Sequence, residues 1–161
     1  MKSDLDGLMA KRGLDAIMVA GDEHDNPPRY YLTKGAAATG GYVFKKQGSE
    51  PVLVVNGMEV AEAAKSGLQV YSYHDFGWGE LLQEMEGDIQ KATIVFWKRM
   101  LQRVRLESGK VGVYGAGNIN HYLELVRLVE AQYPEYQFVG EMGMTLFDEA
   151  YVTKDADEIE R

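Results

Sequence analysis

The stretch Leu14-Asp15-Ala16-Ile17-Met18-Val19-Ala20-Gly21 decides the fold of this chain. It is a short apolar run, rich in branched side chains and bounded by glycines, which is typical of a strand buried on both faces of a sheet. A proline-containing loop over residues 21–29 is predicted to follow this strand, and it brings the segment 26–33 to the edge of the sheet where the strand ends. Loops at this edge of an open α/β sheet usually hold functional residues, and the candidates here are Arg29, Tyr30 and Tyr31. We therefore expect the later elements to pack around this strand.

Composition sets the class of protein. The chain has 161 residues, enough for one domain with a substantial core, and a hydrophobic fraction of 45% excludes disordered and fibrous classes. Cysteine is absent, which excludes disulfides, thiol nucleophiles and thiolate metal sites and fits a cytoplasmic location. The net charge of −8 disfavours nucleic acid as a partner. There is no signal-peptide pattern and no apolar run near the roughly 18 residues of a membrane span, so we expect no membrane partner.

Periodicity and turn residues predict six strands interleaved with four or five helices. The strands are expected over 14–21, 42–45, 51–55, 69–73, 111–114 and 136–139, and the helices over 3–13, 57–66, 80–86, 88–107 and 118–133. Segment 74–79 is predicted to be a loop. Strands 42–45 and 51–55 form a hairpin whereas the other connections are crossovers, so the sheet should be mixed. The prediction is an α/β protein, a three-layer sandwich with a mixed sheet of about six strands flanked by helices.

The last residues of the chain predict a boundary between two domains. After Gly143 the chain is expected to run through residues 144–147 and then begin a charged helix at 154–161, where Asp155 is a suitable cap for a helix with Glu158 at its third position. Such a short helix with one apolar side chain is not stable alone, so we expect the natural protein to continue. The predicted division is a domain of residues 1–150 and, at 151–161, the start of a linker helix into a further domain.

Three segments resemble a known family in their order and spacing. Residues 8–16 (LMAKRGLDA) resemble an opening helix and its step into a strand, residues 29–33 (RYYLT) resemble an "N-x-x-Y-L-T" segment, and residues 152–160 (VTKDADEIE) resemble the entry into a catalytic domain. Together they resemble the N-terminal domain of the creatinase / aminopeptidase P / prolidase family, the "pita-bread" metallopeptidases. The chain departs from the family's pattern at two places. The 26–29 loop replaces the asparagine that usually precedes the Tyr-Leu pair, and Tyr151 stands where the family often has an arginine.

The resemblance implies a creatinase-type N-terminal domain with a ribonuclease H-like motif. It implies a parent hydrolase, an Xaa-Pro aminopeptidase or Xaa-Pro dipeptidase, whose two divalent metal ions, manganese or cobalt, are held by Asp, His and Glu residues of the C-terminal domain. No catalytic residue, metal ligand or cofactor is therefore expected in this chain. The implied partners are its own C-terminal catalytic domain, a second copy in a homodimer, and proline-containing peptides. Two alternatives stay open: a free-standing binding or assembly module of the same fold, and the N-terminal domain of a creatinase-type amidinohydrolase.

Four residues are the candidates for the mouth of the active site or for an interface: Arg29, Tyr30, Tyr31 and Trp78. An arginine can bind a carboxylate at two points, and a tyrosine offers a flat apolar face with a hydroxyl at its tip. The alternative is that Tyr31 and Leu32 pack in the core while Arg29 is solvated. For Trp78, between two glycines, the alternatives are an exposed domain or dimer contact and a place in the core.

Other polar motifs favour structural explanations. Residues 115–120 and Glu141 partly match a dinucleotide-binding fingerprint, but Asn120 replaces its third glycine, which favours a tight turn with Asn118 as a helix cap. Residues 22–25 (DEHD) are more typical of a solvated loop than of a metal site. His74 and Asp75 are neighbours whose side chains usually diverge, which disfavours a catalytic pair. The basic residues within 98–105 indicate the solvated face of a helix. His121 is expected at the surface.

Overall fold

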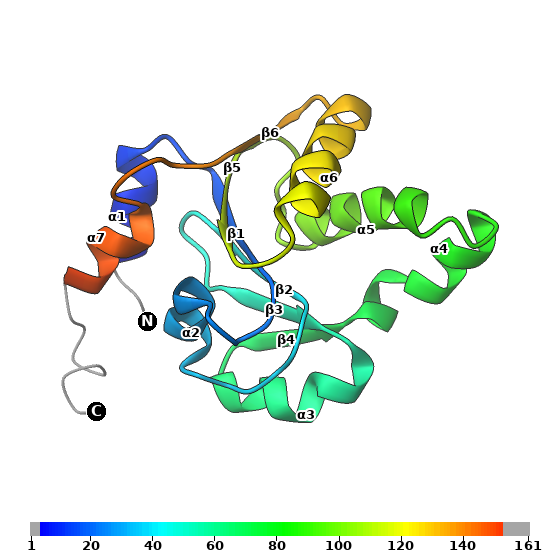
Figure 1. Cartoon of the computed structure of the whole chain (residues 1–161), viewed down its shortest axis with the longest axis horizontal. Helices are drawn as coiled ribbons and strands as arrows, with labels where there is room; N and C mark the ends of the chain where they lie inside the picture. Colours follow the sequence, from blue (N-terminus) through cyan, green and yellow to red (C-terminus); the bar gives the residue numbers. More distant parts are fainter. Residues whose placement is uncertain (1–3, 153–161) are drawn as a thin grey trace.

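The computed structural model describes residues 4–152 and confirms the predicted three-layer α/β sandwich (Figure 1). Its six-stranded sheet has the order β4-β3-β2-β1-β5-β6. The predicted linker helix at 154–161 lies outside the described residues, as does Ser3, the first residue of the predicted helix 3–13.

The stretch quoted at the outset forms β1 (Ala16–Ala20), all of whose residues are buried. It lies in the middle of the sheet, antiparallel to β2 (Tyr42–Lys46) and parallel to β5 (Gly109–Gly115). The sheet is completed by β3 (Val52–Val55), β4 (Gln69–Ser72) and β6 (Tyr136–Val139). The β2–β3 hairpin is antiparallel whereas β3–β4 and β5–β6 are parallel, so the sheet is mixed, as predicted.

Helices cover both faces of the sheet, because β1 directs alternate side chains to opposite sides. Ala16, Met18 and Ala20 join the core beneath α4 (Trp78–Glu84), α5 (Ile89–Arg103) and α6 (Ile119–Gln132). Ile17 and Val19 join a second core on the other face. That core is covered by α1 (Asp4–Lys11), α2 (Pro27–Thr33), α3 (Val60–Ala63) and α7 (Leu146–Val152).

The prediction of a loop over residues 21–29 was wrong for its last three residues, because helix α2 begins at Pro27. The Asn26 side chain caps it, Pro27 and Pro28 occupy its first two positions, and Lys34 ends it in a left-handed conformation. Proline is favoured at the first helical position because its fixed φ suits a helix and its missing N–H is not needed there. The two prolines therefore begin a helix here instead of preventing one.

Three other segments differ from the prediction. The predicted loop 74–79 contains the 3₁₀ turn η3 (Tyr73–Phe76), capped by Ser72 and Asp75, and the first residues of α4. The predicted helix 57–66 is divided into η1 (Gly57–Glu59), α3 and η2 (Ala64–Ser66). Helix α7 was not predicted, because only seven residues form it and its stability comes from packing against α1.

Candidate functional site

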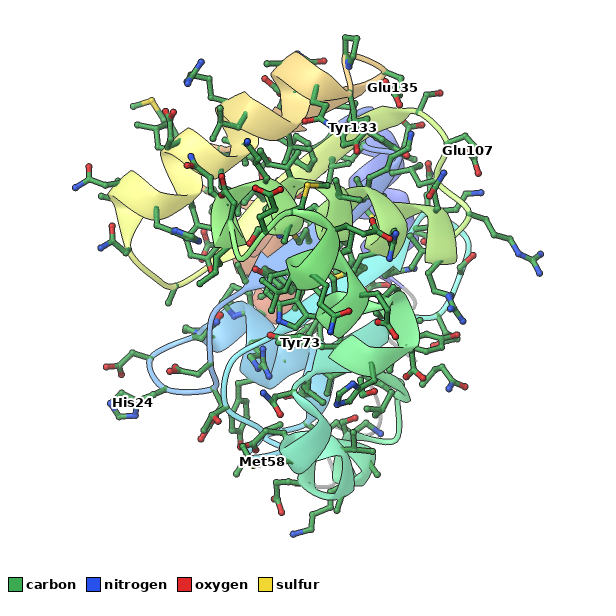
Figure 2. The ribbon with its side chains drawn as sticks, turned by 90° about the vertical axis from the view of Figure 1, so that its right-hand side faces the viewer. His24, Met58, Tyr73, Glu107, Tyr133 and Glu135 are labelled. Carbon is green, nitrogen blue, oxygen red and sulfur yellow. The ribbon has the colours of Figure 1, made fainter. Side chains whose placement is uncertain are left out.

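The carboxyl ends of β1, β4 and β5 and the start of β2 share one edge of the sheet. This edge is where ligands bind in open α/β sheets. It gathers Gly21 after β1, Tyr73 after β4, the turn 115–118 after β5, and Tyr42 at the start of β2. Figure 2 shows Tyr73 near the centre of one side of the molecule.

Arg29 lies at this edge and is completely buried. Its Nη1 donates to the Gly21 carbonyl (2.5 Å) and its Nη2 to the Ala38 carbonyl (2.9 Å). The Asn26 amide positions the start of α2, because its Nδ2 donates to the Ala20 carbonyl (2.8 Å) while its Oδ1 accepts from the Arg29 amide (3.3 Å). The guanidinium thus ties α2 to the end of β1 and to the segment before β2.

Burial lowers the pKa of Arg29, and the nearby carboxylates of Glu23 and Asp22 oppose that effect. An arginine remains charged under these conditions, so the edge holds a permanent cation. Among residues 4–152, neither Arg29 Nε nor the buried Glu23 Oε2 has a hydrogen-bond partner. Burial also raises the pKa of Tyr73 and of Tyr122 to about 12 each, so both hydroxyls stay neutral near pH 7.

The four predicted site residues do not form one surface. Arg29 is buried, contrary to the alternative in which it is solvated. Its guanidinium binds backbone carbonyl groups of the protein itself. Tyr31 is in the core, as that alternative expected, with its ring edge-on to Phe147 (6.1 Å between ring centroids). Tyr30 is 59% exposed and covers Gly35, where an added Cβ would lie 2.7 Å from the ring. Of the three aromatic candidates, Tyr30 presents the most surface to a partner.

Trp78 is half-buried and packs on Phe96 (5.2 Å) and Tyr73 (6.5 Å between ring centroids). Tyr73 is in turn an electrostatic neighbour of Arg29. Tyr73 therefore connects two of the predicted residues across the edge of the sheet. Their role in substrate binding or in an interface stays a prediction.

Sequence reasoning missed Tyr42, Tyr73 and Tyr122 as members of this edge. Two of them could have been found, because Tyr42 begins a predicted strand and Tyr73 ends another. Placing the predicted strands in one mixed sheet would have brought these two to the same edge. Tyr122 gives no such signal, since it lies within a helix and reaches the edge only through the packing of α6.

The glycines of residues 115–117 make room for the protein's own atoms. A Cβ at Gly115 would lie 2.1 Å from the Ala20 carbonyl oxygen, and one at Gly117 would lie 2.4 Å from the Tyr122 ring. Asn118 caps α6 by accepting from the His121 amide (3.1 Å), as predicted. The turn is thus explained by packing, without a bound pyrophosphate.

Glu141, the acidic residue of the partial fingerprint, is engaged within the protein. Its carboxylate accepts hydrogen bonds from Arg12 Nε, from Tyr114 Oη (2.7 Å) and from the Leu146 amide (2.8 Å). These contacts connect α1, β5 and the start of α7. The carboxylate therefore has a structural role.

The remaining polar motifs are exposed or structural. His24 lies at the outer margin of the molecule in Figure 2, where its imidazole is 3.4 Å from Asp25. The Asp75 carboxylate accepts from the Ser72 amide (2.7 Å) and so caps η3. Across residues 4–152 there is no group of three or more His, Asp or Glu side chains arranged to hold a metal ion. Within the same range, no helix combines the length and the hydropathy needed to cross a membrane.

Comparison with known proteins gives matches among solved structures, whereas no protein-family model and no curated protein sequence matches the chain. An X-Pro aminopeptidase from Thermotoga maritima matches with a TM-score of 0.59 and 15% identity, over 99% of this chain and 38% of that one. The prolidase from Pyrococcus horikoshii matches with a TM-score of 0.54 and 19% identity, over 99% and 37%. The creatinase/prolidase N-terminal domain of an X-Pro dipeptidase from Streptococcus pyogenes matches with a TM-score of 0.51 and 14% identity, over 87% and 94%.

These matches define the class of fold. Within residues 4–152 the chain is an α/β domain with a mixed six-stranded sheet flanked by seven α-helices, like the creatinase/prolidase N-terminal domain. It spans less than two fifths of the length of the aminopeptidase and the prolidase. The predicted resemblance is therefore confirmed at the level of the fold.

Proposed function

We propose that this chain is the non-catalytic N-terminal domain of a metal-dependent Xaa-Pro peptidase of aminopeptidase P or prolidase type. The observation that carries the proposal is how much of each solved structure this chain matches. The match covers 99% of this chain but only 38% of an X-Pro aminopeptidase, whereas it covers 87% of this chain and 94% of an isolated N-terminal domain. The described residues do not provide a metal site, so manganese or cobalt would bind to residues of another domain. No step of hydrolysis is assigned to this chain.

The role of such a domain would be to shape the mouth of the active site and to contribute to a dimer contact. Tyr30 supports this role, because it is an exposed aromatic side chain in the middle of a short, firmly held helix. Arg29 would be a positioning residue, since its bonds to the Gly21 and Ala38 carbonyls hold α2 in place. The peptide substrate, the homodimer and the cytoplasmic location are parts of the same proposal.

The test is to determine the gene sequence beyond codon 161 and to assay the complete protein. We expect an open frame that encodes a second domain with two Asp, one His and two Glu ligands. The complete protein, supplied with Mn²⁺, should hydrolyse Xaa-Pro dipeptides, whereas the 161-residue chain alone should not. A Tyr30→Ala variant of the complete protein should raise KM more than it lowers kcat. Leu123→Ala is the control, because this exposed side chain lies on α6, on the other side of the sheet.

Three outcomes would contradict the proposal. A stop codon after Arg161 would favour a free-standing binding module of the same fold. A second domain without the five ligands that acts on a small guanidino substrate in the absence of metal would indicate the creatinase type. Peptidase activity of the 161-residue chain itself would show that the catalytic groups had been placed in the wrong domain.

A further inference from the structure

Charge is segregated along the α4–α5 hairpin, the arm that extends to the right in Figure 1. Residues 66–88 carry five acidic side chains and no lysine or arginine. Residues 89–106 carry five basic side chains and no acidic one: Lys91, Lys98, Arg99, Arg103 and Arg105. Because the net charge of the chain is −8, the residues outside 89–106 together carry −13. The end of α5 is thus a local cationic region on a strongly acidic protein.

Two of the five cations are paired with carboxylates. Lys98 Nζ is 2.5 Å from Glu135, and Lys91 Nζ is 3.8 Å from Asp88. Among the ion pairs of residues 4–152, none contains Arg99, Arg103 or Arg105. These three arginines therefore have no carboxylate partner in the described part of the chain.

The three arginines line one hollow of about 610 Å³ between α5 and η3. Arg99 Nη1 donates to the Phe76 carbonyl (2.7 Å) and Arg103 Nη2 to the Asp75 carbonyl (3.3 Å). The Arg103 guanidinium also lies over the Tyr71 ring, 4.9 Å from its centroid. Each of these contacts uses one N–H group of a guanidinium that has five, so both side chains are ordered and still able to bind an acceptor.

The acidic side chain in this hollow, Asp75, forms no ion pair with the arginines. Asp75 Oδ2 accepts from the amide and the hydroxyl of Ser72, where it caps η3. Arg105, with a positive φ of 59°, and Gln102 are exposed at the rim. The hollow is therefore a cationic, solvent-facing surface, and planar guanidinium groups bind carboxylates well at two points.

We infer that this hollow is a docking site for an acidic protein segment in an extended conformation. Arg99 and Arg103 are four residues apart on α5, which places them about 6 Å apart along the helix axis. Alternate residues of an extended strand are about 6.6 Å apart and lie on the same face. Glutamates or aspartates at alternate positions therefore match the spacing of the two arginines. A short acidic segment fits better than a long phosphate chain, because the charge of −13 elsewhere on the protein repels a polyanion more strongly the further it extends beyond the hollow.

The experiment measures the binding of a fluorescein-labelled (Glu-Ser)₄ peptide to the 161-residue chain by fluorescence anisotropy in 50 mM salt, with (Gln-Ser)₄ as the control peptide. We expect (Glu-Ser)₄ to bind and (Gln-Ser)₄ not to bind. The double variant R99Q/R103Q should weaken binding at least about tenfold, because two charge-assisted contacts are lost. Arg127→Gln is the matched control, since this exposed arginine on α6 is paired with Glu124, and it should change affinity by less than about twofold.

A second variant keeps the test valid if the double variant folds poorly. Gln102→Glu adds a negative charge to the hollow and removes no arginine contact, so it should also weaken binding while the circular dichroism spectrum stays unchanged. The inference is overturned if (Glu-Ser)₄ does not bind, or if Arg127→Gln weakens binding as much as R99Q/R103Q. It is also overturned if inorganic phosphate or an oligonucleotide binds the hollow more tightly than the peptide. The test does not depend on the proposed peptidase role.

Discussion

Arg29 is a buried cation that is stabilised by backbone carbonyl groups of two separate loops. Its guanidinium is completely enclosed, and its hydrogen bonds go to Gly21 and Ala38. Removing the side chain would leave a cavity and two carbonyl oxygens without these donors, which is costly in a buried environment. The same side chain that looked like a ligand-binding arginine in the sequence is thus a main element of local stability.

We expect Arg29→Ala to lower the free energy of unfolding by about 3 kcal/mol. Arg29→Lys should also destabilise, by about 2 kcal/mol, because an ammonium group cannot reproduce the two-pronged contact with both carbonyls. Urea denaturation followed by circular dichroism measures both effects. Arg127→Ala, an exposed arginine, should change stability by less than about 0.5 kcal/mol. An Arg29→Ala variant as stable as the parent chain would contradict this account.

Gly115 is required by the close approach of β5 and β1. A Cβ at this position would lie 2.1 Å from the Ala20 carbonyl oxygen, and the backbone has a φ of +113°. Gly115→Ala should therefore destabilise the chain by more than about 2 kcal/mol. Gly140→Ala is the matched control, because an added Cβ there would meet no atom within 4 Å. Equal thermal denaturation midpoints for the two variants would show that the strands can separate without cost.

At the scale of elements, Arg12 joins α1 to α7. Its Nη1 donates to Glu149 (2.9 Å) and its Nε to Glu141, which also accepts from Tyr114 and from the Leu146 amide. Burial alone would raise the pKa of Glu141, but these hydrogen bonds outweigh it and hold the pKa below its usual value of 4.5. The carboxylate thus releases its proton more readily in the folded chain than in the unfolded one.

This shift gives the stability of the α1–α7 contact a pH dependence with a definite sign. Because the folded-state pKa is lowered, the contribution of Glu141 is fully present above about pH 4.5 and is lost as the pH falls through the lower folded-state value. We expect Glu141→Gln to reduce stability at pH 7 and to make the loss of stability below pH 4.5 less steep. Urea midpoints measured from pH 7 to pH 3 test this, and a parallel decline in both proteins would contradict it.

The elements also show why some of this structure could be predicted and some could not. Strand β1 was predictable because five consecutive buried residues leave an uninterrupted apolar run. Helix α2 was not, because two consecutive prolines are typical of a loop, although at the first turn of a helix they cause no break. The burial of Arg29 depends on carbonyl groups at residues 21 and 38, and nothing in the local sequence indicates that these come together. Helix α7 depends on packing against α1, a contact between the two ends of the described chain.

At the scale of the whole molecule, the two cores share strands of the sheet, and β1 is the shared strand in its middle. Ile17 and Val19 belong to the core beneath α1, α2, α3 and α7, while Met18 between them belongs to the core beneath α4, α5 and α6. Both tryptophans, Trp78 and Trp97, lie on the Met18 side. Tryptophan fluorescence therefore reports one face of the sheet, whereas far-ultraviolet circular dichroism reports the backbone of the whole domain.

We expect the two faces to unfold together, because β1 cannot leave one core and remain in the other. Ile17→Ala removes a buried side chain from the face without tryptophan and should cost about 3 kcal/mol. Its urea midpoint should fall by the same amount in fluorescence and in circular dichroism, as a single cooperative transition requires. Leu123→Ala, at an exposed position on α6, should leave both midpoints unchanged. If the fluorescence midpoint of Ile17→Ala stayed at the parent value while circular dichroism shifted, the layers would be separate folding units and the shared strand would not couple them.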